Sequence, residues 1–168
     1  MRGAFQAILL PKVLAGASLG AVIPPRQTLS LNEGWRFQKQ INPGSAIEWQ
    51  FRDAWKPTYD GSGWSRIFLP HSWDQVARNP WVTANHWRGI GWYRKEFVMP
   101  ASAAGARIFI EFEGALQVAK VWVNGREAGE HVGGYTGFVF DVTDLIRLSG
   151  NNLLVIMVAW FASRSKAI

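Results

Sequence analysis

The sequence predicts an all-β fold, either a β-sandwich or a jelly roll. Stretches that alternate between apolar and polar residues are short and are separated by turn residues, and no stretch shows a sustained helical periodicity. The 168 residues include 17 Gly and 8 Pro, which suit many turns better than long helices. With 48% hydrophobic and 18% charged residues, the chain can bury the core of a single domain.

About seven to nine short strands are expected along the chain. The pattern places them at residues 28–31, 35–38, 64–69, 91–99, 107–113, 118–123, 138–142 and 153–158. Residues 107–113 alternate strictly, which predicts one buried face. The run at 118–123 ends in Asn124-Gly125, a strong hairpin signal, because a type I′ turn needs a positive φ at both central residues. The run at 153–158 is continuously apolar, which is typical of a strand buried on both faces.

Residues 1–26 are expected to be an N-terminal extension or a signal peptide. A basic start at Arg2, an apolar run and the small residues at 15–17 fit a secretory signal, although Pro11 and Lys12 interrupt the run. If these residues are a signal peptide, the protein would be secreted or periplasmic. No apolar run reaches the roughly 18 residues that a transmembrane helix needs, so we expect no membrane span.

The net charge of +6 does not indicate a nucleic-acid partner, because the excess of basic residues lies at the two ends of the chain. Residues 27–163 contain 13 basic and 12 acidic side chains and are therefore almost neutral. The absence of cysteine excludes disulfides and thiolate metal sites. The three histidines at 71, 86 and 131 lack metal-ligand spacing. We expect no metal, no cofactor and no nucleic-acid partner.

Five motifs follow one another in a fixed order. They are Leu-Pro-His-Ser-Trp at 69–73, Gly-Trp-Tyr-Arg-Lys-Glu-Phe at 91–97, Val-Trp-Val-Asn-Gly at 121–125, His-Val-Gly-Gly-Tyr-Thr-Gly-Phe at 131–138 and Asp-Val-Thr at 141–143. An Asn-Asn-Leu strand comes after them. Together these motifs resemble the N-terminal sugar-binding domain of glycoside hydrolase family 2, the group of β-galactosidases, β-glucuronidases and β-mannosidases. The resemblance covers about residues 28–158.

The resemblance implies a jelly roll of the galactose-binding-like type. In the family this domain precedes an immunoglobulin-like domain and a (β/α)₈ barrel, which are the expected partner domains. The barrel carries both catalytic glutamates for hydrolysis of O-glycosidic bonds, and loops of the jelly roll help to wall its sugar pocket. The chain is therefore expected to be a truncated piece of a hydrolase that is inactive alone.

Two departures from the family pattern affect how the chain is divided. Gly137 stands where the family usually has proline, and residues 159–168 do not continue the family sequence. We therefore expect three segments, which are the extension or signal peptide at 1–26, a jelly-roll sugar-binding domain at 27–158 and an unrelated tail at 159–168.

Two loops contain the candidate sugar-binding residues. A pyranose needs an aromatic ring for its apolar face and planar polar groups for its hydroxyls. The loop between residues 75 and 91 supplies Asn85, His86, Trp87 and Arg88, and the glycine-rich loop supplies His131 and Tyr135. Structural roles stay open for both loops, since Trp87 could pack beneath its loop and His131 could tie its own loop together.

No catalytic residue is expected. Glu111 and Glu113 are the closest acidic pair outside the loops, but they alternate with apolar residues and so belong to the solvent face of a strand. Three functions stay open at this point. The chain could be the non-catalytic sugar-binding and scaffold domain of a family 2 hydrolase, a stand-alone carbohydrate-binding module, or a purely structural module that packs on other domains.

Overall fold

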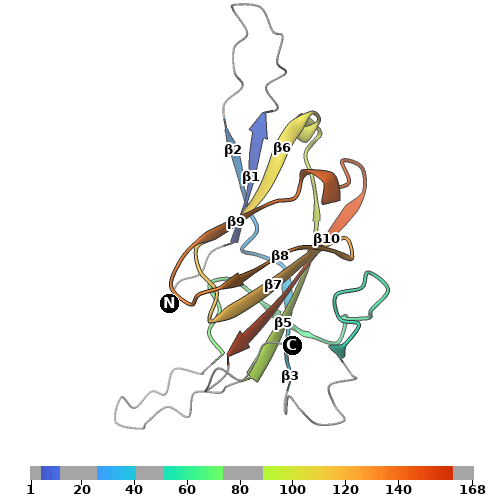
Figure 1. Ribbon diagram of the computed structural model, residues 1–168. Coiled ribbons are helices and arrows are strands. Elements are labelled where there is room, and N and C mark those ends of the chain that lie inside the picture. The colour runs from blue at the N-terminus through green and yellow to red at the C-terminus, as the bar shows by residue number, and fades with distance from the viewer. Residues whose placement is uncertain (1–4, 12–25, 41–50, 74–88, 161–168) are drawn as a thin grey trace, which may run out of the picture.

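The structure, a computed structural model, describes residues 5–11, 26–40, 51–73 and 89–160. Within these ranges ten strands form two antiparallel sheets, which confirms the predicted all-β sandwich (Figure 1). The smaller sheet has the strand order β2-β1-β6-β9, and the larger has the order β4-β3-β5-β10-β7-β8. The strands are β1 (Phe5–Pro11), β2 (Gln27–Ser30), β3 (Trp35–Gln40), β4 (Ser65–Ile67), β5 (Gly89–Val98), β6 (Ala106–Phe112), β7 (Val118–Val123), β8 (Arg126–Val132), β9 (Phe138–Asp141) and β10 (Asn151–Trp160).

Two single-turn helices lie between strands, η1 (Ala101–Ala103) and η2 (Thr143–Leu145). No helix in this part of the chain has the length and apolar character needed to cross a membrane.

The main hydrophobic core lies between the two sheets. In β6, Ile108, Ile110 and Phe112 point inward and are 2%, 0% and 0% exposed, as the alternation predicted. They pack with buried side chains of the larger sheet, including Trp35 on β3 and Ile156 on β10. Burial of one such side chain contributes roughly 1.5–3 kcal/mol, so contact between the sheets is a main source of stability.

A second hydrophobic cluster covers the outer face of the larger sheet. The segment 51–64 lies over Trp92, Trp122 and Val155. The Trp122 ring stacks on those of Trp55 and Trp92, with centroids 6.5 and 5.9 Å away. Strand β10 is consequently buried on both faces, which explains its continuous apolar sequence.

One buried arginine fastens the segment 51–64 to the sheet. Arg94 on β5 is 7% exposed, and its guanidinium donates hydrogen bonds to the backbone carbonyls of Ala54, Lys56 and Tyr59. The bonds to Lys56 and Tyr59 measure 3.2 and 3.0 Å. Burial lowers the pKa of Arg94, and the three carbonyl dipoles compensate for the lost water.

Two asparagines join the β7–β8 hairpin to the beginning of β10. Asn124 and Gly125 form the hairpin turn with φ values of 53° and 80°, so the predicted hairpin is confirmed. The Asn124 Nδ2 donates to Asn152 Oδ1 at 2.8 Å. The fully buried Asn152 also exchanges hydrogen bonds with the backbone N–H and carbonyl of Arg147, at 2.7 and 2.8 Å. The side chain of Asn152 is thereby satisfied on both its oxygen and its nitrogen.

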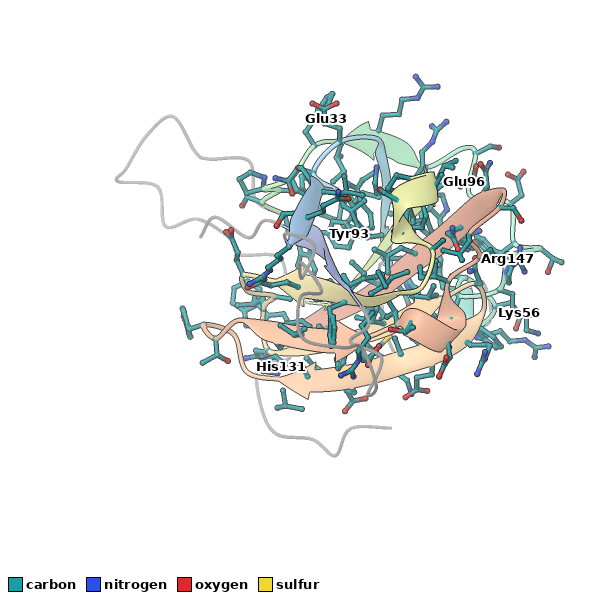
Figure 2. The ribbon with its side chains drawn as sticks, turned by 90° about the horizontal axis from the view of Figure 1, so that it is seen from above. Glu33, Lys56, Tyr93, Glu96, His131 and Arg147 are labelled. Carbon is teal, nitrogen blue, oxygen red and sulfur yellow. The ribbon has the colours of Figure 1, made fainter. Side chains whose placement is uncertain are left out.

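Tyr93 lies in the interior of the molecule (Figure 2). It holds His71 and Trp73, which precede the loop that contains candidate residues 85–88. Trp73 Nε1 donates to the Tyr93 hydroxyl at 2.6 Å, and His71 Nδ1 lies 3.1 Å from the same oxygen. Phe37 packs on the His71 ring at 4.5 Å between centroids. Burial raises the pKa of Tyr93. Burial lowers the pKa of His71, and the nearby positive charge of Lys39 lowers it further. These contacts fit a neutral His71 whose Nδ1 accepts a hydrogen bond from the Tyr93 hydroxyl.

The structure differs from the expected segments at both ends. Residues 5–11, expected to precede the domain, form β1, which pairs with β2 and β6 inside the smaller sheet. An apolar run of this length is typical of a signal peptide and of a buried strand alike, so composition does not separate them. At the other end β10 continues past residue 158 to Trp160, and Ala159 belongs to the second cluster.

Replacing Asn152 by alanine should destabilise the fold strongly. Asn152→Ala leaves the N–H and carbonyl of Arg147 and the Asn124 Nδ2 without their partner at a partly buried site, and the loss of such a bond costs about 1–3 kcal/mol when the group stays away from water. We expect the free energy of unfolding from urea titration to fall by about 2–4 kcal/mol. Asn151→Ala is the matched control, because Asn151 is exposed, and it should change stability by less than about 0.5 kcal/mol. Equal effects of the two substitutions would contradict the network's role.

His71 should make the fold sensitive to mild acid. In the unfolded chain a histidine takes up its proton near pH 6.5, whereas burial holds the pKa of the folded His71 lower. The free energy of unfolding is therefore unaffected by His71 above about pH 6.5 and falls as the pH drops below it. His71→Gln, which keeps an acceptor for Tyr93, should flatten this decline in urea titrations between pH 7 and 5. Ser72→Ala should keep the wild-type slope, and an unchanged slope in His71→Gln would refute the explanation.

Candidate functional site

The structure describes two of the six candidate residues. Asn85, His86, Trp87 and Arg88 lie outside the described ranges. His131 and Tyr135 lie at the end of β8 and in the loop that leads to β9.

His131 ties the glycine-rich loop to its own base. Its ring stacks on Phe138 with centroids 4.1 Å apart and planes 15° apart. Its Nε2 lies 3.1 Å from the Thr136 hydroxyl, so it bridges to the far side of the loop. The Gly133 N–H donates to the Gln117 carbonyl at 2.6 Å, which anchors the loop to the chain before β7. These contacts show the loop-tying arrangement that the sequence left open for His131.

Tyr135 stands at the tip of this fixed loop. Its side chain is 82% exposed, and Val132 nearby is 72% exposed. Tyr135 therefore presents an aromatic face and a hydroxyl to solvent, which is the combination that a sugar ring requires. Because the loop is anchored on both sides, the ring is positioned with limited loss of freedom on binding.

The backbone conformation at Gly133 favours glycine, and the space beside it is tight. Gly133 has a φ of 153°, and an added Cβ would lie 3.1 Å from both His131 Nε2 and Thr136 Oγ1. A larger residue would therefore disturb the hydrogen bond that closes the loop.

Asp141 secures the end of the strand that follows the loop. Its Oδ1 accepts hydrogen bonds from the Thr143 hydroxyl at 2.6 Å and the Thr143 N–H at 3.0 Å, and Arg107 forms an ion pair with its Oδ2. The Thr143 hydroxyl and then Arg107 lower the pKa of Asp141. The Asp-Val-Thr motif thus holds β9 against β6.

The acidic pair at the end of β6, Glu111 in the strand and Glu113 just after it, faces outward. Glu111 forms a 3.5 Å ion pair with Arg26, and Glu113 is exposed. Among the described residues no group of His, Asp and Glu could hold a metal ion.

Comparison with known proteins gives a consistent result. A family model for the sugar binding domain of glycosyl hydrolases family 2 matches residues 29–167, beyond the boundary expected at 158. A β-galactosidase of Thermoanaerobacter pseudethanolicus is 34% identical over 134 residues, which are 79% of this chain and 17% of that protein. A β-glucuronidase of Formosa agariphila is 32% identical over 140 residues, or 79% of this chain and 13% of that protein.

A solved structure agrees with these sequence matches. The crystal structure of Bacteroides uniformis β-glucuronidase superposes with a TM-score of 0.65 at 30% identity, covering 80% of this chain and 15% of that one. The chain thus spans less than a fifth of the length of each of these relatives. Because the family match covers most of the chain and the fold agrees, the chain belongs to the sugar-binding domain family of the family 2 glycosyl hydrolases.

Proposed function

We propose that this domain acts as the non-catalytic sugar-binding and scaffold domain of a glycoside hydrolase. The exposed Tyr135 on a loop closed by His131 is the observation that supports sugar contact. Hydrolysis of O-glycosidic bonds would belong to the longer protein, since the relatives named β-galactosidase and β-glucuronidase extend far beyond the matched region.

Each candidate residue has a distinct role in this proposal. Tyr135 stacks on the apolar face of a sugar ring, and His131 positions the loop rather than contacting the ligand. Asn85, His86 and Arg88 supply planar polar groups for hydroxyls, and Trp87 adds a second aromatic face. The immunoglobulin-like and barrel domains implied by the family resemblance are the proposed partners.

The same exposed surface also suits a structural role. Tyr135 and Val132 could be covered by another domain, because exposed apolar side chains that cluster often mark contact surfaces. A stand-alone carbohydrate-binding module would use Tyr135 in the same way as the proposed domain. Sugar titration separates the binding roles from the purely structural one.

The chain alone should not hydrolyse glycosides. A retaining hydrolase needs two carboxyl groups about 5–5.5 Å apart with one of them protonated, and Glu111 is instead paired with Arg26. Incubation with nitrophenyl β-galactoside and β-glucuronide should release no nitrophenol above the uncatalysed rate. Turnover that disappears in Glu111→Gln or Glu113→Gln would contradict the proposal.

Removing the Tyr135 ring should weaken sugar binding. An aromatic contact contributes about 0.5–1.5 kcal/mol, so Tyr135→Ala should lower the affinity for galactose by about two- to tenfold. Amide shifts of Gly133 and Gly134 in an NMR titration would report binding at this loop, with a dissociation constant expected in the millimolar range. Val132→Ala, at another exposed apolar side chain close in sequence, should leave the affinity unchanged. Equal affinities of Tyr135→Ala and the wild type would favour the structural role.

A further inference from the structure

Three arginines form a row across the edge of the larger sheet. Arg36 on β3 lies opposite Arg66 on β4 and opposite Arg94 on β5 in the strand register. Directly opposite residues of antiparallel strands point to the same face with Cβ atoms about 4.5–5.5 Å apart, and like charges in such pairs repel. The row therefore concentrates positive charge on one face.

This charge is not neutralised by ion pairs within the described ranges. The ion pairs found there involve none of the three arginines. Arg94 is held by backbone carbonyls, and Arg36 Nη1 donates to the Trp64 carbonyl at 3.1 Å. Carbonyl dipoles satisfy donors but carry no net charge, so the row keeps its positive charges, which the nearby carboxylates of Asp60 and Glu96 offset in part at Arg94. Arg66 is exposed to solvent.

A pocket of about 360 Å³ opens beside this row, between the segment 51–64 and strands β3, β5 and β10. Arg36, Arg94 and Lys95 bring three cations to its lining, and Asp60 and Glu96 bring two carboxylates. The remaining lining residues include the apolar Pro57, Tyr59 and Leu153. This size falls within the range of small-molecule sites.

Both carboxylates accept hydrogen bonds from neutral donors and so keep their charge, which leaves the lining with three cations, two anions and one net positive charge. Asp60 Oδ1 accepts the Ser62 N–H at 2.8 Å within its own turn. Glu96 Oε2 accepts a 3.4 Å hydrogen bond from Asn151. By contrast, the Arg36 guanidinium uses one of its five N–H donors in the hydrogen bond to Trp64 described above.

We propose that this pocket binds the anionic group, a carboxylate or sulfate, of an acidic saccharide. Arg36 is the principal ligand, because a planar guanidinium matches such oxyanions, and Lys95 and Arg66 add attraction. The apolar lining residues contact the sugar ring. This inference rests on the proposed sugar-binding function and extends it to a second site, since His131 lies on the opposite side of the molecule from Glu96 and Lys56 (Figure 2).

Paired ligands test the inference. Glucuronate and glucose differ in having a carboxylate or a hydroxymethyl group at one ring carbon. Isothermal titration at constant ionic strength, which fixes screening, should show glucuronate binding at least about tenfold more tightly than glucose. Arg36→Gln should reduce glucuronate affinity about tenfold, and Arg66→Gln about twofold. Arg66→Gln keeps the test valid if Arg36→Gln fails to fold. The exposed Arg66 side chain makes no hydrogen bond among the described residues, so its replacement should not disturb the fold.

The matched control is Arg126→Gln at the other edge of the same sheet. Arg126 Nη1 also donates to one backbone carbonyl, that of Asp144, at 3.0 Å. This variant should keep wild-type glucuronate affinity, and urea titration should show that it and Arg36→Gln remain folded. Equal affinities for glucuronate and glucose, or an unchanged affinity in Arg36→Gln, would overturn the proposal. Inorganic sulfate that competes as strongly as glucuronate would also overturn it, because the ring would then contribute nothing.

The galactose titration at the Tyr135 loop tests the broader function separately. If galactose binding depends on Tyr135 but glucuronate is not preferred over glucose, the proposed function stands and the proposal for the pocket is wrong. Glucuronate binding that depends on Arg36, without galactose binding at the loop, would keep the pocket and remove the role of Tyr135.

Discussion

The hydrogen bonds from the Arg94 guanidinium to three backbone carbonyls keep the outer face of the larger sheet covered. They hold the segment 51–64 against the sheet, although that segment has turns rather than strands to satisfy its carbonyls. With the segment in place, Trp92 and Trp122 are buried on a face that would otherwise meet water. The sheet is consequently the middle layer of the molecule, packed on both sides, and the pocket beside Arg94 exists only because of this segment.

The same segment also reaches the hairpin that the asparagines secure. An added Cβ on Gly125 would lie 2.7 Å from the Pro57 ring, so the turn and the segment are in direct contact. Asn124 in that turn bonds Asn152 at the beginning of β10. The hairpin is therefore joined to the central strand β10 by hydrogen bonds and touches the covering segment through the Pro57 ring. The loops at the edges can carry exposed side chains because this frame does not depend on them.

Local sequence patterns predicted the features that depend on neighbouring residues. Alternation at 107–113 predicted the buried face of β6, and Asn124-Gly125 predicted the hairpin, because both signals arise within a few residues. The arginine row was not predicted, since Arg36, Arg66 and Arg94 are brought together only by the register of three strands. Composition could not identify β1 for a similar reason, because its place between β2 and β6 depends on pairing with distant residues. The sequence also left two roles open for His131, sugar contact and tying its loop. Only the fold shows that its ring contacts Phe138 and Thr136, as loop tying requires.

The two proposed sugar contacts differ in how much they can contribute alone. Tyr135 is almost fully exposed, so stacking on it removes little water and leaves one face of the ligand in solvent. An open contact of this kind gives weak binding unless other groups close over the sugar. Arg36 works differently, because it lies in a pocket, is already oriented by the Trp64 carbonyl and attracts charge over a longer range. An acidic saccharide would therefore gain most of its affinity at the arginine row, whereas a neutral one would depend on what Asn85, His86, Trp87 and Arg88 add to Tyr135.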